Sequence, residues 1–314
     1  MARSEQVLHG TPSMARLFAR ASLAMVPGAA ALPFVGGGAG AIRERALVLA
    51  DQRVDRDRLA AYDRVCGFGF SDLLPATYPH MLAFPLQLSL LTSGSFPVPA
   101  IGLVHIANRI VQHRPLRADE RLSLRVWATP LSPHPRGRQF TLRSEAWVGP
   151  EKVWEESSLN LARGRRDDAV PSPDGPPDSS ALPQAAVWRL PGDLGRRYGS
   201  VSGDINPIHV HPLSAKLFGF PAAIAHGMWT KARCLAQLGR ELPDAFTVDV
   251  AFRKPILLPA KVVFAEGGPG GPGGPGDPAA ADGGPMGAEH TIAFGVRDAR
   301  KGTVHLDGLL TPGT

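Results

Sequence analysis

A short polar stretch in the second half of the chain, "YGSVSGDINPIHVHP" (residues 198–212), combines the residue types that acid–base chemistry uses. The carboxyl group of Asp204 is followed by Asn206 and His209. A neutral imidazole can take a proton and a carboxyl group can give one, so the pair could move protons on a bound substrate. Asn206 before Pro207 also suits a helix N-cap followed by the first helical position. The stretch is therefore either a capped helix start or an acid–base pair held at a helix entrance.

The chain around this stretch shows signs of an internal duplication. "YDRVCGF", which begins at Tyr62, and "YGSVSGD", which begins at Tyr198, carry Tyr, Val and Gly at the same spacing. Further on, "QHRPLRADERLSLRVWA" parallels "FRKPILLPAKVVFAE", and each is a basic-Pro turn that leads into an alternating strand. We therefore predict two copies of one domain, each of about 120 residues, which is an ordinary domain size.

Each copy is predicted to hold a helical segment near its start and several antiparallel strands after it. The expected strands lie in residues 121–131, 138–149 and 152–164 of the first copy, and in residues 246–256, 261–266, 289–298 and 302–310 of the second. Antiparallel strands with the helix segregated to one face make an α+β layer architecture.

The two copies differ at the polar stretch. The shared register places three apolar residues of the first copy opposite Asp204, Asn206 and His209; these are Phe68, Phe70 and Leu73. Helix capping alone would have allowed polar residues in both copies. One polar site in two copies predicts one catalytic half and one half adapted to another task.

The stretch "SGDINPIHVHPLSAKLFGFPAAIAHGM" (202–228) resembles the signature of the MaoC-type (R)-specific enoyl-thioester hydratases, also called 3-hydroxyacyl-thioester dehydratases. The resemblance covers about 30 residues, with weaker agreement through "FRKPILLPA". It implies a hot-dog fold, in which an antiparallel sheet wraps a central helix, and the duplicated layout resembles the double hot-dog members. It implies reversible hydration of a trans-2-enoyl thioester, with Asp204 and His209 as the catalytic residues and Asn206 as the motif asparagine.

The residue types fit that chemistry. Dehydration needs a base for an α-proton and an acid for the departing hydroxyl, and the division of these roles between Asp204 and His209 stays open. The enolate that develops on the thioester oxygen needs hydrogen-bond donors. "IAHGM" predicts a helix that begins near Gly227, where the absent side chain allows close approach to free N–H groups.

The resemblance and the charge indicate the partners. The substrate would be a thioester of coenzyme A or of an acyl carrier protein, and the net charge of +6 suits a phosphate-bearing pantetheine arm. Arg253 and Lys254, before a turn proline, are the candidate residues for that contact. Residues 79–91 of the first copy, "PHMLAFPLQLSLL", are expected to line an apolar tunnel for the acyl tail or, alternatively, only to pack the two copies together.

Composition divides the chain further. We predict an N-terminal extension (1–43), a degenerate hot-dog domain (44–164), a disordered Pro-rich linker (165–184) and a catalytic hot-dog domain (185–314). The last domain contains a Gly/Pro-rich hairpin loop, residues 266–288.

Several other classes are disfavoured. With only two cysteines there is no disulfide framework, so we expect a cytoplasmic protein. No stretch is apolar and long enough to cross a bilayer, and scattered basic residues with few aromatics argue against nucleic acid. No metal or other cofactor is expected, and a homodimer of double hot-dogs is the candidate assembly.

The remaining histidines have simpler interpretations. His209, His211 and His226 could bind a metal, but the segment is predicted to be a loop that enters a helix. His226 is expected to hold the "AHGM" turn, and His105 to be a buried, satisfied strand histidine that could approach the pocket. Met228, Trp229 and Leu235 share helical spacing and are expected in the core.

Two functions from other classes stay open. A hot-dog thioesterase would share the fold and hydrolyse the thioester, although it would not need the Asp–Asn–Pro–His order. A non-catalytic acyl-thioester binding module would not need an intact Asp204 and His209.

Overall fold

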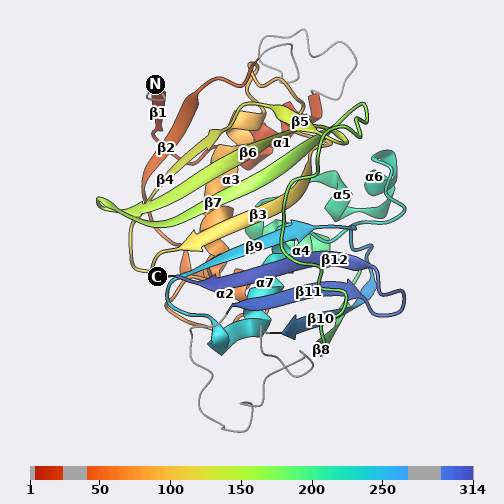
Figure 1. Ribbon diagram of the computed structural model, residues 1–314. Helices are drawn as coiled ribbons and strands as arrows, with labels where there is room; N and C mark the ends of the chain where they lie inside the picture. The colour runs from red at the N-terminus through yellow and green to blue at the C-terminus, as the bar shows by residue number, and fades with distance from the viewer. Residues whose placement is uncertain (1–3, 24–40, 268–290, 314) are drawn as a thin grey trace.

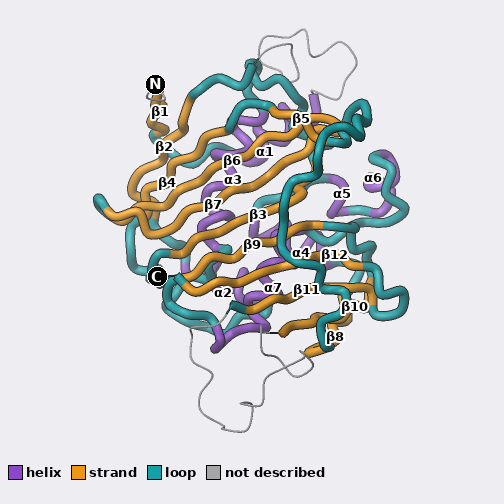
Figure 2. Tube along the Cα trace, in the orientation of Figure 1, coloured by secondary structure: helices purple, strands orange, loops and turns teal. Residues whose placement is uncertain are grey.

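The structure, a computed structural model, describes residues 4–23, 41–267 and 291–313. In these residues twelve strands form one sheet, in the order β1-β2-β4-β6-β7-β3-β9-β12-β11-β10-β8, with β5 paired to β6. The helices lie together on one side of this sheet (Figures 1 and 2). The β1–β2 pair is parallel and the other pairs are antiparallel.

The first half supplies β2 to β7 and two long helices. Its elements are β2 (Arg45–Gln52), α2 (Arg56–Cys66), α3 (Tyr78–Leu91), β3 (Val104–Gln112), β4 (Leu122–Ala128), β5 (Ser132–His134), β6 (Gly137–Val148) and β7 (Glu151–Arg163). The second half repeats this plan with β8 (Gln184–Leu190), α4 (Leu194–Ser202), α5 (Pro207–Val210), α6 (Pro212–Leu217), α7 (Gly227–Leu238), a short 3-10 turn (Gly239–Glu241), β9 (Phe246–Phe252), β10 (Ala260–Gly267), β11 (Ile292–Asp298) and β12 (Val304–Pro312).

The sequence repeat is visible in the packing of α2 against α4. Both helices end at a glycine in the left-handed conformation, Gly67 with φ 84° and Gly203 with φ 85°. Residues with a side chain rarely adopt this conformation, so glycine is favoured at both positions. The rings of Tyr62 and Tyr198, which occupy equivalent positions, lie 6.1 Å apart between centroids. The duplicated α+β arrangement expected from the sequence is confirmed.

The two halves join edge to edge in the middle of the sheet. Ala107–Gln112 of β3 pair antiparallel with Phe246–Ala251 of β9. One hydrophobic core runs through both halves and includes the buried faces of α3 and α7. Because of this junction, any site between the halves is held by a continuous hydrogen-bonded ladder.

The N-terminal region and the linker both contact this framework. β1 (Ser4–Leu8) extends the sheet beyond β2, and α1 (Met14–Leu23) packs on α3. Residues 165–183 contain no helix or strand, yet they cross the face of the sheet opposite the helices (Figure 1). Ser179 is buried there and donates its N–H and Oγ–H to Asp307 Oδ1 at 2.9 and 2.7 Å. The linker that we expected to be disordered is therefore attached to β12 at this point.

The Gly/Pro-rich loop lies almost wholly outside the described residues. The strands on either side of it, β10 and β11, pair antiparallel, as a hairpin requires. The domain boundaries themselves stay predictions.

Candidate active site

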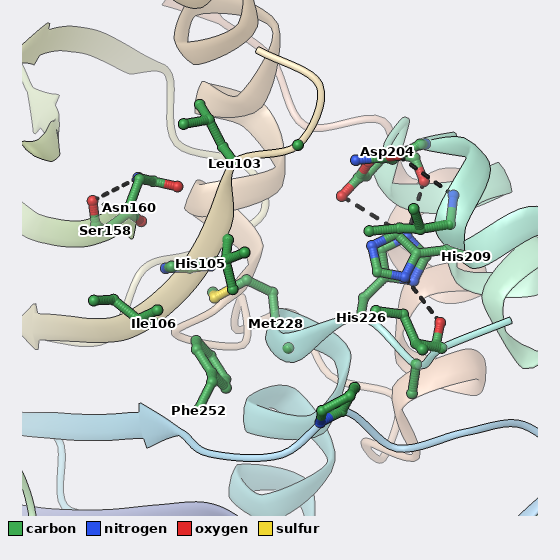
Figure 3. A pocket seen from close by; sticks show the side chains of 18 of the residues that line it. Leu103, His105, Ile106, Ser158, Asn160, Asp204, His209, His226, Met228 and Phe252 are labelled. Carbon is green, nitrogen blue, oxygen red and sulfur yellow. Dashed lines mark hydrogen bonds and ion pairs between the residues drawn. The ribbon is translucent and has the colours of Figure 1, made fainter. Parts of the chain in front are cut away.

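A cavity of about 370 Å³ lies at the junction of the two halves, and both halves line it. Figure 3 shows Asp204, His209 and His226 on one side of it. On the other side lie residues of β3 and β7 and the residue just before β3, with Met228 and Phe252 between the two sides; these residues of the other side are Leu103, His105, Ile106, Ser158 and Asn160. The residues predicted from one short stretch thus meet residues from the opposite half.

Asp204 and Asn206 each combine a local structural role with a place in this cavity. Asp204 follows Gly203 at the end of α4, and its Oδ1 accepts the N–H of Asn206 at 3.2 Å. Asn206 caps α5, since its Oδ1 accepts the N–H of Ile208 at 3.4 Å. The N-cap and first-turn proline expected here are confirmed. Capping and acid–base chemistry are compatible, because Asp204 keeps Oδ2 free of the turn.

His209 and His226 stack on each other with ring centroids 3.6 Å apart and planes 25° apart. His209 Nδ1 lies 2.8 Å from the carbonyl oxygen of Ile224, so Nδ1 carries the proton and Nε2 is left with a free lone pair. Burial lowers the pKa of His209 and keeps the ring neutral. A neutral His209 with a free Nε2 is equipped to accept a proton.

We expected the side chain of His226 to hold the "AHGM" turn, but in the structure it contacts the loop that carries Asp204 instead. Its Nε2 donates to the backbone oxygen of Asp204 at 2.9 Å and lies 3.8 Å from Asp204 Oδ2. Burial and the nearby His209 lower its pKa to about 3. The reason is the tertiary packing: α7 begins next to the loop that carries Asp204, so the imidazole of His226 hydrogen-bonds to that loop and not to its own backbone.

Two glycines that the sequence analysis missed bring this loop close to α4. A Cβ on Gly195 would overlap the carbonyl group of His209, and a Cβ on Gly199 would lie 2.9 Å from the carbonyl oxygen of Asp204. The four-residue spacing places both glycines on one face of α4. A pair of glycines at that spacing just before the motif is the signal that could have revealed them.

Gly227 begins α7, as predicted, and faces Phe252. A Cβ at Gly227 would meet the Phe252 ring at 3.0–3.1 Å, so the glycine allows the two to pack closely. His226 is the N-cap residue but makes no side-chain capping bond. The first N–H groups of a helix have no partner within the helix, and the dipole there favours negative charge. This end of α7, which lines the cavity, can stabilise an oxyanion.

Helix α3 adds a further part of the cavity wall. His80, Met81, Phe84, Gln87, Leu88 and Leu91 from this helix line the cavity, and Phe18 and Ala21 of α1 add to it. Residues 79–91 therefore do border the cavity, but Leu86 does not: it is fully buried in the core. Phe70 and Leu73 are exposed, and neither they nor Phe68 lines the cavity.

His105 departs from the expectation of a satisfied strand histidine. It lines the cavity, which was the alternative, but its buried Nε2 has no hydrogen-bond partner among the described residues. Met228 and Trp229 are buried in the core as expected, and Met228 also borders the cavity. Trp229 Nε1 donates to the carbonyl oxygen of Val65.

Arg253 and Lys254 lie on the cavity wall, both exposed. Arg253 Nε donates to Asp307 Oδ2 at 2.6 Å, so the carboxylate that anchors the linker already holds this guanidinium. Lys254 accepts at its carbonyl oxygen from His305 Nδ1, which leaves its ammonium group free of that contact. Lys254 is therefore the better placed of the two to meet an incoming anion.

The polar atoms of Asp204, His209 and His226 lie within 4.8 Å of one another, so they need testing as metal ligands. Stacked rings direct their in-plane lone pairs side by side, not toward one point. His211 caps α6 through the N–H of Leu213 and is exposed. These histidines fit a metal ion poorly.

A tandem hot-dog architecture with an Asp–His pair in the cavity beside the N-terminus of one central helix defines the class of protein, and comparisons with known proteins agree. Residues 184–266 match the MaoC-like domain family. The 3-hydroxyacyl-thioester dehydratase X of Mycobacterium tuberculosis is 39% identical over 217 residues, which are 69% of this chain and 78% of that protein. The chain belongs to the MaoC-like dehydratase family.

Solved structures extend the likeness to the whole fold. A crystal structure of HtdX from M. tuberculosis superposes with a TM-score of 0.70 at 33% identity, over 86% of this chain and all 100% of that one. A second M. tuberculosis protein, described as a double hotdog fold, gives a TM-score of 0.52 at 13% identity, over 84% of this chain and 94% of its own. The predicted double hot-dog fold is confirmed.

Proposed function

We propose that the protein interconverts a trans-2-enoyl thioester and the (R)-3-hydroxyacyl thioester, with Asp204 and His209 as the catalytic residues. The observation that carries this proposal is that both side chains line one cavity with the N-terminus of α7. The 3-hydroxyacyl-thioester dehydratase X named above supports the same reaction class.

The geometry supports a division of the catalytic roles. In dehydration, His209 Nε2 would take the α-proton, because Nδ1 is committed to the Ile224 carbonyl group. The Asp204 carboxyl group would hold the 3-hydroxyl and supply the proton with which it leaves as water. The enolate oxygen would meet the first N–H groups of α7 at Gly227. After dehydration His209 carries the α-proton and Asp204 is ionised. Return of that proton from His209 to Asp204, through the water that forms, resets the site, so no proton is gained or lost overall. Hydration is the same path in reverse.

His226 would act as a positioning residue. Its hydrogen bond to the Asp204 backbone would fix the position of the loop, and its stacked ring would fix the orientation of the His209 ring. Reacting groups held this way need little rearrangement during the reaction.

The partners and location follow as proposals. The substrate would be carried on coenzyme A or an acyl carrier protein, with Lys254 near the phosphate-bearing arm. Cys66 and Cys234 are both free and buried, which supports a reducing compartment such as the cytoplasm. Among the described helices, none combines the length and apolar character needed to cross a bilayer. We propose that the protein forms a homodimer of double hot-dogs, which size-exclusion chromatography would test by measuring the mass in solution.

One assay separates this function from its competitors. Purified protein is mixed with crotonyl-CoA in the presence of a chelator, and three quantities are followed: enoyl absorbance, free thiol and the configuration of the product. Loss of enoyl absorbance with (R)-3-hydroxybutyryl-CoA as product supports the proposal. Exclusive release of thiol would identify a thioesterase, and binding without any turnover would identify a binding module.

A further inference from the structure

The cavity wall opposite Asp204 contains two histidines that the proposed chemistry does not use. His80 of α3 and His105 of β3 lie with ring centroids 6.5 Å apart and planes 14° apart. Both line the cavity, among apolar neighbours that include Met81, Phe84 and Ile106. A wall that served only a hydrocarbon tail would need no imidazole groups here.

His80 is held in one orientation by a buried carboxylate. Its Nδ1 lies 2.6 Å from Oε1 of Glu156, whose side chain is fully buried. Burial by itself would raise the pKa of Glu156, but His80 and Asn108 outweigh it and hold the pKa at about 2. The ionised carboxylate therefore accepts from Nδ1–H, which leaves Nε2 of His80 for other partners.

Asn108 and Lys231 complete the support behind His80. Lys231 Nζ donates to Asn108 Oδ1 at 2.6 Å, which fixes the direction of the amide. Asn108 Nδ2 then donates to Glu156 Oε1 at 2.7 Å, and Gln87 Nε2 donates to Oε2 at 3.1 Å. The carboxylate is thus satisfied without His105.

His105 makes no hydrogen bond to this network. Its ring lies 4.9 Å from the Phe252 ring between centroids, and its buried Nε2 has no partner among the described residues. Burial and the neighbouring His80 lower the pKa of His105 to about 4, so it is neutral. Buried polar atoms are nearly always hydrogen-bonded, so His105 Nε2 beside the cavity has an unused hydrogen-bonding position that a ligand atom could fill.

We propose that His105 and His80 form a subsite for an uncharged hydroxyl group on the acyl chain beyond the reacting carbons. This inference rests on the proposed function for the direction of the chain. Phe252 packs against Gly227 at one end and His105 at the other, so an acyl chain that starts at the α7 N-terminus and follows Phe252 reaches His105. At this subsite the ionised Glu156 lies directly behind His80, so an uncharged hydroxyl is favoured there over an acyl carboxylate.

The test is a binding series that requires no turnover. Saturated acyl-CoA thioesters of one length are titrated by calorimetry: the plain chain, the same chain with one hydroxyl on successive carbons beyond the fourth, and the same chain with a terminal carboxylate. The acyl-CoA with its hydroxyl at one particular carbon should bind roughly tenfold more tightly than the plain acyl-CoA, on the scale of one buried hydrogen bond. We call this increase in affinity the hydroxyl gain. The carboxylate should bring no gain.

Variants locate the effect. His105→Phe should abolish the hydroxyl gain, and His105→Gln should keep part of it because the amide can still hydrogen-bond. Phe84→Leu, on the same wall, changes shape without polarity and should keep the gain. Thermal melting checks that each variant is folded.

Absence of a hydroxyl gain in the wild-type protein, including absence of any acyl-CoA binding, overturns the subsite. A gain that survives His105→Phe overturns the assignment to His105. Hydroxyl-selective binding without hydration of crotonyl-CoA would leave the subsite standing and count against the proposed function. Hydration of crotonyl-CoA without hydroxyl-selective binding would support the proposed function and contradict the subsite.

Discussion

His226 donates to the backbone of Asp204 while its ring stacks on His209, so one buried imidazole touches both proposed catalytic residues. It lies 22 residues beyond Asp204 in the chain. Neither contact depends on a charge on His226, and burial and the neighbouring His209 oppose protonation of its ring. Before substrate reacts, both histidines of the site are therefore neutral.

This neutrality predicts how stability depends on pH. The pKa of His226 is lowered to about 3 in the folded protein, whereas an unfolded histidine has a pKa of about 6.5. Below about pH 6.5 the unfolded state binds the extra proton, so the free energy of unfolding should fall as pH falls, by up to roughly 1.4 kcal/mol per pH unit for this group. Above pH 6.5 the group contributes no slope.

Urea unfolding between pH 7.5 and 4.5 measures this slope for the wild type and for His226→Phe. The variant should show a shallower loss of stability toward acid. The exposed His211→Ala is the matched control and should retain the wild-type slope. Parallel curves for wild type and His226→Phe would refute the assignment.

Loss of either catalytic group should remove most of the turnover. We expect Asp204→Asn and His209→Ala each to lower kcat roughly a hundredfold or more, the usual scale for a positioned acid or base. Steady-state hydration of crotonyl-CoA measures kcat, and circular dichroism checks folding. If both folded variants stay active, the residues serve only in the turn and cap described above.

Gly195 should be needed for the position of His209. An alanine there would press on the His209 carbonyl group, so we expect Gly195→Ala to lower kcat about tenfold or more, on the scale of a small misplacement in a site. Gly192→Ala is the control, because its Cβ would meet only Pro259 at an ordinary 3.9 Å. Equal kcat values for the two variants would contradict the close approach of α4 to the loop.

Lys254 should attract the phosphate-bearing arm through an exposed charge. Lys254→Ala is expected to raise the KM for acyl-CoA several-fold, and added salt should raise the wild-type KM because exposed charges are screened. Lys261→Ala removes an exposed charge on β10 outside the cavity and serves as the control. A KM that neither salt nor Lys254→Ala changes would exclude this contact.

The α3 wall should set the preferred acyl length. Leu88 borders the cavity, so Leu88→Trp should shift the best substrate toward shorter chains, with each excluded methylene losing roughly 0.8 kcal/mol of burial. Leu86 faces the core, and Leu86→Met should leave the chain-length profile unmoved. The profile is measured as kcat/KM over a series of enoyl-CoA substrates. An unchanged profile in a folded Leu88→Trp protein would mean that α3 only packs the halves together.

The amino-acid sequence alone determined the features that depend on neighbours along the chain. The glycine before Asp204, the cap at Asn206 and the start of α7 at Gly227 are short-range features, and the matching Tyr, Val and Gly positions revealed the duplication. Alternation and turn residues were enough to predict most strands, because burial on one face of a sheet imposes a period of two.

Tertiary structure decided which distant residues share the cavity. His226 reaches Asp204, Gly195 admits His209, and His105 arrives from the other half through the β3–β9 ladder. No local pattern encodes these contacts, since they depend on how helices and strands far apart in the chain pack. The same packing left His105 Nε2 buried beside the cavity without a partner among the described residues, a property that cannot be predicted until the surroundings of a side chain are known.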